Sequence, residues 1–366
     1  MRVTVLSHNL SSNAAMRAHR LAGALATAHE VRLVGPVEKA GPWTALPREP
    51  WIRFVRKTRF PEFATSFAEL VEEAQGEVLV AVKPQLASFG AALVAGELRN
   101  VPVVLDVDDL DLALAPREEW ISDPSKADLT RPGSAVYVSL LTRGVGAAAA
   151  VTVASTALQR RFGGTLVPHG SDGRLFDPAR VDRDAARRGF GFAGRTVVFP
   201  GTPREHKGIG VLARAVAKLP GVQLAVPCRP GELAGPEWGG LPLHRIPQLP
   251  YESLPELIAA GDVVALPQLD SDAARHQMPM KAFDAMAMGA PIVASAVSDL
   301  PEVLDGCARF VGPGDEPALE RALADLLSNR DEARELGARA RRRFVERYSL
   351  ARIAETLDGV IQSVAR

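Results

Sequence analysis

Short runs of apolar residues alternate with helix-like segments along most of the 366-residue chain. In the first half, the apolar runs predict strands at residues 3–6, 31–34, 78–82, 101–105, 149–153 and 164–167. Amphipathic segments, such as residues 14–28 and 67–74, lie between these runs. Strands and helices that alternate in this way are typical of a parallel sheet covered on both faces.

The alternation stops at residues 168–188, a polar segment that contains Gly170, Gly173 and Pro178. It then restarts, with strands predicted at residues 196–199, 222–226, 243–246, 262–266 and 292–294. We therefore expect an α/β protein with two Rossmann-like domains, residues 1–170 and 171–348, that face a central cleft. Ligands of such sheets bind at the carboxyl ends of the strands, so we expect the site in that cleft. A helix near residues 316–348 precedes a last helix over residues 350–364.

Residues 278–295 predict a loop, a short helix and a buried strand. Pro279 suits the first helical position, and Gly289 can take the left-handed conformation that ends a helix. The helix would direct free N–H groups and its positive dipole end towards a ligand. It carries Lys281 and Asp284 on one face, because they are three residues apart. This arrangement favours an anionic ligand with hydroxyl groups, such as a nucleotide or a sugar phosphate.

Composition narrows the class of protein. Lys+Arg and Asp+Glu are each 43, so no net field favours nucleic acid or an anionic membrane. The apolar share of 47% is that of a soluble globular protein, and no apolar run reaches the ~18 residues that a membrane span requires. Cys228 and Cys307 are too few for a metal cage or a disulfide framework. Residues 1–7 already have the pattern of a strand, so we expect no signal peptide. We expect a cytoplasmic protein without membrane insertion.

The second predicted domain opens with a strand that runs into a glycine-rich turn holding two cations. Gly201, Arg204, Lys207 and Gly208 lie in this turn, and the helix over residues 209–219 follows. Arginine binds two phosphate oxygens as a fork and lysine adds a point charge, which is what a diphosphate requires. The alternative is a solvated turn whose charges pair with Glu205.

Residues 276–293 resemble a sequence motif of a known protein family more specifically than any other segment of the chain does. The run Asp284-Ala285-Met286-Ala287-Met288-Gly289-Ala290-Pro291-Ile292-Val293 resembles the tail of the glutamate–seven residues–glutamate motif of retaining glycosyltransferases with the two-domain GT-B architecture, in particular family 4. In this chain His276 takes the position of the first glutamate and Asp284 that of the second. Residues 201–208, 167–172 and 260–267 resemble other segments of the same family, so that the resemblance covers nearly the whole chain.

The resemblance implies a role for each matching residue. A nucleotide-diphosphate sugar would be bound by Gly201, Arg204, Lys207, Met278, Pro279, Met280 and Asp284. His276, Arg204 and Lys207 would be the catalytic residues, with His276 contacting the transferred sugar or the leaving phosphate. The resemblance also implies that no metal or other cofactor takes part, and that the last helix, residues 349–366, returns to the first domain.

Acceptor residues are expected in the first domain. Ser12, Asn13 and Arg17 follow the first strand, either facing the cleft or, for the first two, capping the next helix. In the run of residues 106–111, Asp108 and Asp109 could bind acceptor hydroxyls or an amine; a metal site and turn-capping carboxylates are the alternatives. His169 lies in the interdomain segment and either faces the cleft or is structural.

Residues 115–133 are long and irregular enough to form an acceptor loop. Tryptophans in loop-like stretches could stack on an acceptor sugar or pack on loops; these are Trp43, Trp51, Trp120 and Trp238.

These patterns lead to one interpretation and two alternatives. We expect a glycosyltransferase, hexosyltransferase-like, that moves a sugar from a nucleotide-diphosphate sugar to an acceptor with retention of configuration. The acceptor, whether a sugar, a glycoside, a lipid-linked sugar or a natural product, stays open, as do the nucleobase, the donor sugar and the oligomeric state. One alternative is a nucleotide-sugar-binding scaffold or partner subunit that has lost activity at His276. The other is a nucleotide-sugar epimerase of the same fold, which would use His276 and His169.

Overall fold

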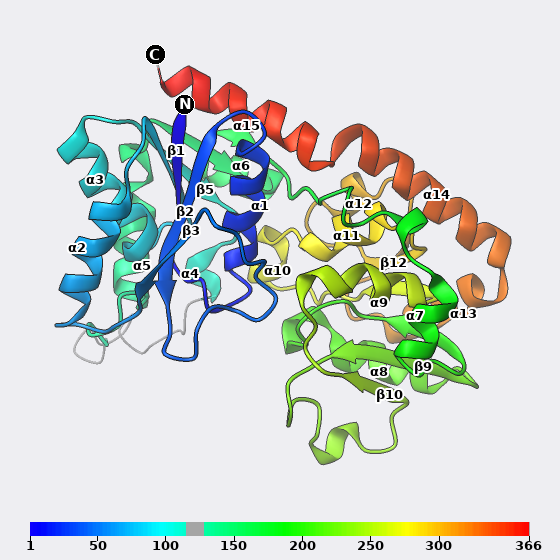
Figure 1. The fold of residues 1–366 in the computed structure, drawn as a ribbon. Helices are drawn as coiled ribbons and strands as arrows, with labels where there is room; N and C mark the ends of the chain where they lie inside the picture. The colour runs from blue at the N-terminus through cyan, green and yellow to red at the C-terminus, as the bar shows by residue number, and fades with distance from the viewer. Residues whose placement is uncertain (115–127, 366) are drawn as a thin grey trace. The chain divides into compact units, whose positions relative to one another are not determined.

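The computed structural model describes residues 1–114 and 128–365. The chain divides into two compact units (Figure 1). Unit 1 consists of Met1–His169, His276–Met278 and Leu350–Arg366, and unit 2 of Gly170–Arg275 and Pro279–Ser349. The predicted second domain, residues 171–348, was continuous, whereas three of its residues belong to unit 1. Most of the predicted acceptor loop, including Trp120, lies outside the described residues.

Unit 1 is built on a parallel sheet of seven strands in the order β3-β2-β1-β4-β5-β6-β7. Its strands are β1 (Arg2–Ser7), β2 (Glu30–Val37), β3 (Ile52–Arg56), β4 (Val78–Val82), β5 (Val103–Val107), β6 (Ala150–Val153) and β7 (Thr165–Leu166). All residues of β4 and β5 are buried, since helices cover both faces of a parallel sheet. The strand order reverses between β1 and β4, which is the position where such sheets bind ligands.

The helices of unit 1 are α1 (Ala15–Leu25), α2 (Phe63–Glu73), α3 (Ala91–Arg99), α4 (Asp111–Leu114), α5 (Ala135–Arg143), α6 (Thr156–Phe162) and α15 (Leu350–Val364). The last of them packs along α1, so the predicted return of the final helix to the first domain is confirmed (Figure 1). At this contact His29 Nε2 lies 2.8 Å from Asp358 Oδ1.

Unit 2 repeats the same plan with a parallel sheet of six strands in the order β10-β9-β8-β11-β12-β13. Its strands are β8 (Arg195–Val198), β9 (Val222–Pro227), β10 (Leu243–Ile246), β11 (Val263–Leu266), β12 (Ile292–Ser295) and β13 (Arg309–Val311). Its helices are α7 (Arg183–Gly189), α8 (Ile209–Ala217), α9 (Leu254–Ala260), α10 (Asp272–His276, whose last residue joins unit 1), α11 (Met280–Ala287), α12 (Leu300–Val303), α13 (Glu316–Ser328) and α14 (Arg330–Arg347). Here the order reverses between β8 and β11.

The structure departs from the sequence prediction at a few elements. Strands β3 and β13 were not predicted, because both are short edge strands with exposed arginines. The predicted strand 101–105 begins two residues later, after Pro102. The predicted helix over residues 316–348 is two helices, because Asn329 leaves the helical conformation and its side chain accepts a hydrogen bond from the Glu332 N–H to cap α14.

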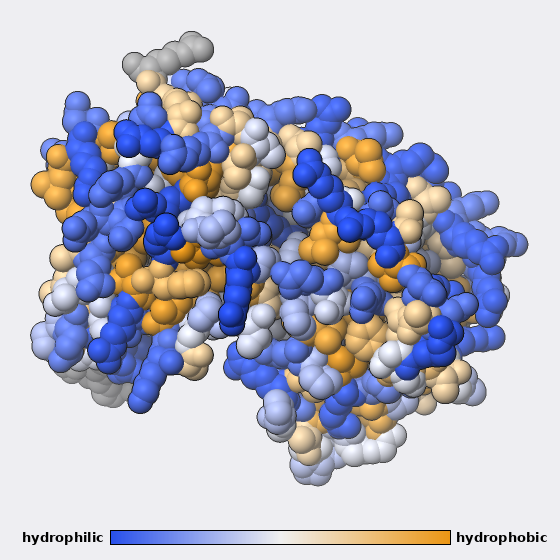
Figure 2. All heavy atoms as spheres, viewed as in Figure 1, coloured by the Kyte–Doolittle hydropathy of each residue, from blue (hydrophilic) through white to orange (hydrophobic). Residues whose placement is uncertain are grey.

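The outer surface is mixed in polarity. On the face shown in Figure 2, apolar residues are scattered among hydrophilic ones on both units. The exposed large apolar side chains in the described chain are Phe54, Val94, Leu98, Leu129, Leu140 and Val345. Within residues 1–114 and 128–365, no helix has the length and apolar character to cross a membrane.

Candidate functional site

The loop after β8 is shaped by glycine. It ends in a short 3-10 turn, Glu205–Lys207, and Gly208 then starts α8 with a positive φ of 67°. A Cβ atom at Gly208 would lie 1.6 Å from the carbonyl oxygen of Pro267, which follows β11. Only glycine therefore allows this loop to pass so close to the next strand. The contact joins the two strand ends where the order of the sheet reverses.

The two cations of this loop have protein partners. Arg204 Nη1 lies 3.2 Å from Glu232 Oε1, and the side chain is about half exposed. Lys207 Nζ lies 3.5 Å from the carbonyl oxygen of Thr202. Arg204 thus pairs with Glu232 and not with Glu205, the partner that the sequence offered as an alternative. A phosphate at this guanidinium would share or replace Glu232.

Helix α11 begins at Met280, one residue later than predicted. Pro279 is its N-cap residue, with an extended ψ of 117°, so the prediction that it takes the first helical position is wrong. No side chain caps this end of the helix. The prediction for the other end is confirmed, since Gly289 has a φ of +60°. Asp284, which is 5% exposed, accepts a hydrogen bond of 2.6 Å from the Ser171 hydroxyl.

Lys281 lies between α11 and the start of the glycine loop. Its Nζ is 3.5 Å from the centre of the Phe199 ring, and a Cβ atom at Gly201 would lie 3.4 Å from it. Burial holds the pKa of Lys281 well below its usual value, and nearby Lys207 acts in the same direction. The sequence placed Lys281 on the ligand face of the helix but did not show that it is buried.

In unit 1, Arg17 is an interior residue and does not face an open surface. Its Nε and Nη2 lie 2.8 and 2.7 Å from the two carboxylate oxygens of Asp106, and Nη2 also donates to the Val167 carbonyl. Arg17 is 1% exposed and Asp106 is fully buried. The expectation that Arg17 contacts an acceptor is therefore corrected: this ion pair joins α1 to β5.

Ser12 and Asn13 do not cap α1 with their side chains. The N-cap residue is Ala14, without a side-chain hydrogen bond. The backbone carbonyls of Ser12 and Asn13 instead accept from the N–H groups of Ala15 and Met16. The capping prediction is wrong because the turn before α1 closes through its main chain. Ser12 is half-buried and Asn13 exposed.

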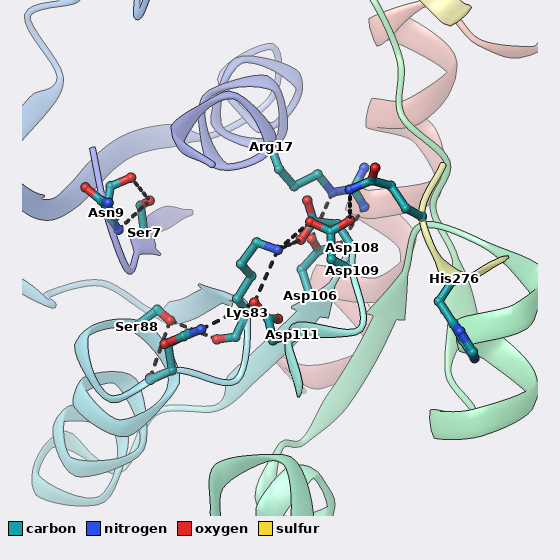
Figure 3. A network of polar contacts seen from close by, with 12 residues as sticks. Ser7, Asn9, Arg17, Lys83, Ser88, Asp106, Asp108, Asp109, Asp111 and His276 are labelled. Carbon is teal, nitrogen blue, oxygen red and sulfur yellow. Dashed lines mark hydrogen bonds and ion pairs between the residues drawn. The ribbon is translucent and has the colours of Figure 1, made fainter. Parts of the chain in front are cut away.

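After β5 the chain carries an acidic run, Asp108, Asp109 and Asp111, and the amine of Lys83 lies among these three carboxylates (Figure 3). Its Nζ is 2.7 Å from Asp109, 3.0 Å from Asp108 and 3.4 Å from Asp111. Burial acts to lower the pKa of Lys83, but the three carboxylates outweigh it and raise that pKa well above its usual value. Burial also raises the pKa of Asp108 to about 7, against the attraction of Lys83. The lysine thus supplies the positive charge that a metal ion would otherwise supply.

Lys83 was not predicted as a site residue; it follows the wholly buried strand β4 and has an unusual φ of +74°. Within the described residues, no group of three or more His, Cys, Asp or Glu side chains is arranged to hold a metal ion.

Residues 276–278 contact the acidic run and its surroundings. Gln277 Nε2 donates to Asp109 Oδ1 at 2.8 Å, and the Ser155 hydroxyl donates to the His276 carbonyl at 3.3 Å. The His276 imidazole points away from the carboxylates (Figure 3). His169 is 2% exposed, with Nδ1 3.3 Å from Arg17 Nη1. Burial and then Arg17 lower the pKa of His169 well below its usual value, so that it is a neutral interior residue.

A cavity of about 90 Å³ lies in unit 1, lined by His8, Asn9, Lys57, Thr58, Gln85 and further residues. His8 and Gln85 follow β1 and β4, the pair at which the sheet order reverses. Burial lowers the pKa of His8 to about 3, and Lys83 and Lys57 add to this effect. The cavity therefore presents a neutral imidazole and an amide beside the acidic run.

Comparison with solved structures identifies the architecture. Sucrose-phosphate synthase from Thermosynechococcus elongatus matches 99% of this chain and 98% of its own, with a TM-score of 0.74 and 19% identity. Anabaena HepE in complex with UDP-glucose matches 99% and 100%, with a TM-score of 0.73 and 15% identity. The chain has the GT-B fold. At these identities the likeness extends to the fold alone.

Sequence comparisons concern part of the chain. A family model described as "Glycosyl transferase-like" matches residues 209–359. An MMP alpha-(1->4)-mannosyltransferase of Mycolicibacterium hassiacum is 34% identical over 214 residues, 55% of this chain and 49% of that protein. A D-inositol 3-phosphate glycosyltransferase of Mycolicibacterium vanbaalenii is 33% identical over 187 residues, 44% and 40% of the two chains. The chain thus matches about half or less of the length of these relatives.

Proposed function

We propose that this chain is a retaining glycosyltransferase of the family 4 type, which moves a sugar from a nucleoside diphosphate sugar to a hydroxyl-bearing acceptor. One observation carries the proposal. At the carboxyl ends of β8 and β11, the glycine loop that bears Lys207 meets the uncapped N-terminus of α11, which bears Asp284. The family model matched at residues 209–359 includes α11, and two relatives similar to this chain are named as sugar transferases.

Each part of this arrangement suits one part of the donor. Arg204 and Lys207 would bind the diphosphate, together with the free N–H groups at the start of α11. Asp284 would accept a hydrogen bond from a ribose hydroxyl while Ser171 holds its Oδ1. The same cations stabilise the negative charge that develops on the diphosphate as the glycosidic bond breaks. The acceptor hydroxyl would then attack from the face that the diphosphate leaves, without a metal cofactor.

A thermal-shift screen with UDP, GDP, ADP and TDP tests the donor part. We expect one nucleotide to raise the melting temperature, and its sugar conjugates then to be screened as donors against simple sugars and glycosides. Anomeric proton couplings of the product report its configuration. If none of the nucleotides stabilises the chain, the donor site is wrong; a product of inverted configuration would refute only retention.

A second candidate, a nucleotide-sugar-binding protein without turnover, is favoured by His276. It stands where the family has a glutamate, and its imidazole points away from the polar network of unit 1 (Figure 3). His276→Glu separates the two candidates, with His276→Ala as the control for loss of the ring. If the chain is a transferase that depends on His276, either change should reduce transfer activity. A gain of transfer activity in His276→Glu alone favours the binding protein.

The epimerase alternative is weakened by the burial of His169. Epimerisation would require acid–base groups that reach the sugar. His169 is 2% exposed and contacts Arg17, so it lies in the core of unit 1.

A further inference from the structure

Lys281 carries a buried amine without a hydrogen-bond partner in the described chain. The residue is 9% exposed, and its Nζ forms no hydrogen bond with any residue of the described chain. Burying an amine of this kind costs free energy on folding, because it loses its hydration and gains no hydrogen bond in exchange. A ligand is one explanation for such a group, provided that the amine lies where a ligand can reach it.

The amine lies at the entrance of the phosphate loop. Phe199 is the first residue after β8 and Gly201 is the third. Lys281 Nζ lies over the ring face of Phe199 and beside Gly201. Lys281 is the second residue of α11, whose N-terminus is not capped by any side chain. The amine and the free N–H groups of the helix therefore meet beside the loop that carries Lys207.

A second buried group at the same strand ends also lacks partners. Gln268 follows β11, the neighbour of β8, and is 1% exposed. Neither its Oε1 nor its Nε2 has a hydrogen-bond partner within the described residues. Two unsatisfied polar side chains at one edge of the sheet are what a polar ligand would satisfy.

We propose that Lys281 binds the diphosphate of the nucleotide donor beside Gly201, and that its amine takes up one proton from the solvent when the phosphates bind. The inference rests on the proposed donor site and makes it more specific: the site has a third cation, which becomes charged only with its ligand. The step is a simple protonation, in which the lone pair of the amine receives a proton from a buffer acid.

The electrostatic surroundings explain the proton. Burial holds the pKa of Lys281 low, and Lys207 from the glycine loop repels a second positive charge. On its own helix, the Asp284 carboxylate is one turn away and is engaged with Ser171. The ring face of Phe199 favours the charged form, the more so in a desolvated contact, but it offers no hydrogen bond in place of the lost hydration. A bound diphosphate reverses this balance, since nearby negative charge favours the protonated form of an amine.

Calorimetry in two buffers measures this proton directly. Wild-type protein is titrated with the nucleoside diphosphate that it binds, at one pH near 8, in phosphate-free buffers of different ionisation enthalpy. The dependence of the binding enthalpy on the buffer gives the number of protons taken up. We expect an uptake approaching one in the wild type and none in Lys281→Met, with binding ~10- to 100-fold weaker in that variant.

Two further variants make the result specific. Lys281→Arg carries a permanent charge and should bind the nucleotide without proton uptake. Lys218→Met removes an exposed lysine at the far end of α8 and should behave as the wild type. The melting temperature of Lys281→Met shows that it folds, and we expect no decrease, because the change removes a buried amine without a hydrogen-bond partner.

The outcomes separate the two proposals. Equal affinity in the wild type and Lys281→Met overturns the role of Lys281 while leaving the donor site intact. Weaker binding in Lys281→Met without proton uptake in the wild type overturns the protonation step. If no nucleoside diphosphate binds the wild type, the donor site itself is wrong.

Discussion

Asp108 offers a sharp test of the electrostatics of unit 1. Its carboxyl group is buried 3.0 Å from Lys83 Nζ, and burial raises its pKa from 3.8 to about 7. Asp108→Asn replaces it with an amide of the same shape as the protonated acid but without the charge. Lys83 keeps Asp109 and Asp111 as partners in this variant.

The sign and size of the effect follow from the two pKa values. The folded chain holds the Asp108 proton more tightly than the unfolded chain does, so the free energy of unfolding falls as the pH rises from 3.8 to about 7. Each pH unit between these values is worth about 1.36 kcal/mol, which gives an upper limit of about 4 kcal/mol. Asp108→Asn has no carboxyl group at this position, so its free energy of unfolding should not show this decrease with pH. Its advantage over the wild type should therefore grow by about 2–3 kcal/mol between pH 5 and pH 8.5.

Urea unfolding monitored by tryptophan fluorescence measures this difference. A Trp238→Phe background leaves Trp43, Trp51 and Trp120, all within the residue range of unit 1, to report on that unit. The change with pH is the quantity to compare, because any fixed cost of the amide cancels. Glu97→Gln, at an exposed position of α3 in unit 1, is the control and should follow the wild type at every pH. If Asp108→Asn also runs parallel to the wild type, the carboxyl is not held protonated and the reasoning fails.

Three further substitutions test other parts of the structure. Lys207→Ala should weaken nucleoside diphosphate binding by roughly 1.5–3 kcal/mol in calorimetry, and unchanged affinity would remove Lys207 from the site. Gly208→Ala forces the loop away from the Pro267 carbonyl and into a strained φ, so we expect a stability loss of about 1–3 kcal/mol or more; a wild-type melting temperature would contradict it. Arg17→Met leaves the buried Asp106 charge without its cation and should cost about 3–5 kcal/mol in urea unfolding, whereas a loss below about 1 kcal/mol would show that the pair is weak.

The fold could be predicted well wherever local pattern and burial agree. Strand β4 was predicted with its observed ends, because all five of its residues are apolar and buried. The last helix, Leu350–Val364, was also predicted with its observed ends. Edge strand β3 escaped prediction because only Ile52 and Val55 are buried, and its arginines resemble those of a loop.

The candidate site could be predicted where glycine geometry is local, and not where charges meet across the sheet. Gly289 was identified from its position after a helix, since few other residues take a left-handed conformation there. Lys83 was missed because its partners come more than 20 residues later in the chain. Strands β4 and β5 pair with Val82 beside Asp106, so the lysine after one and the acids after the other are neighbours only in the sheet. Without Lys83, the acidic residues of the run 106–111 predicted acceptor binding, with a metal site as an alternative.

The packing of α15 on α1 has a consequence for the order in which the chain is completed during synthesis. The apolar residues that α15 buries, including Ile353, Leu357 and Ile361, are translated only after the whole of residues 170–349. Unit 2 has all its segments when Ser349 leaves the ribosome, whereas unit 1 is still without its final helix. Although domains generally fold from the N-terminus, here the unit that starts first must finish last. Until then, α1 lacks its cover on a nascent chain that chaperones would have to protect.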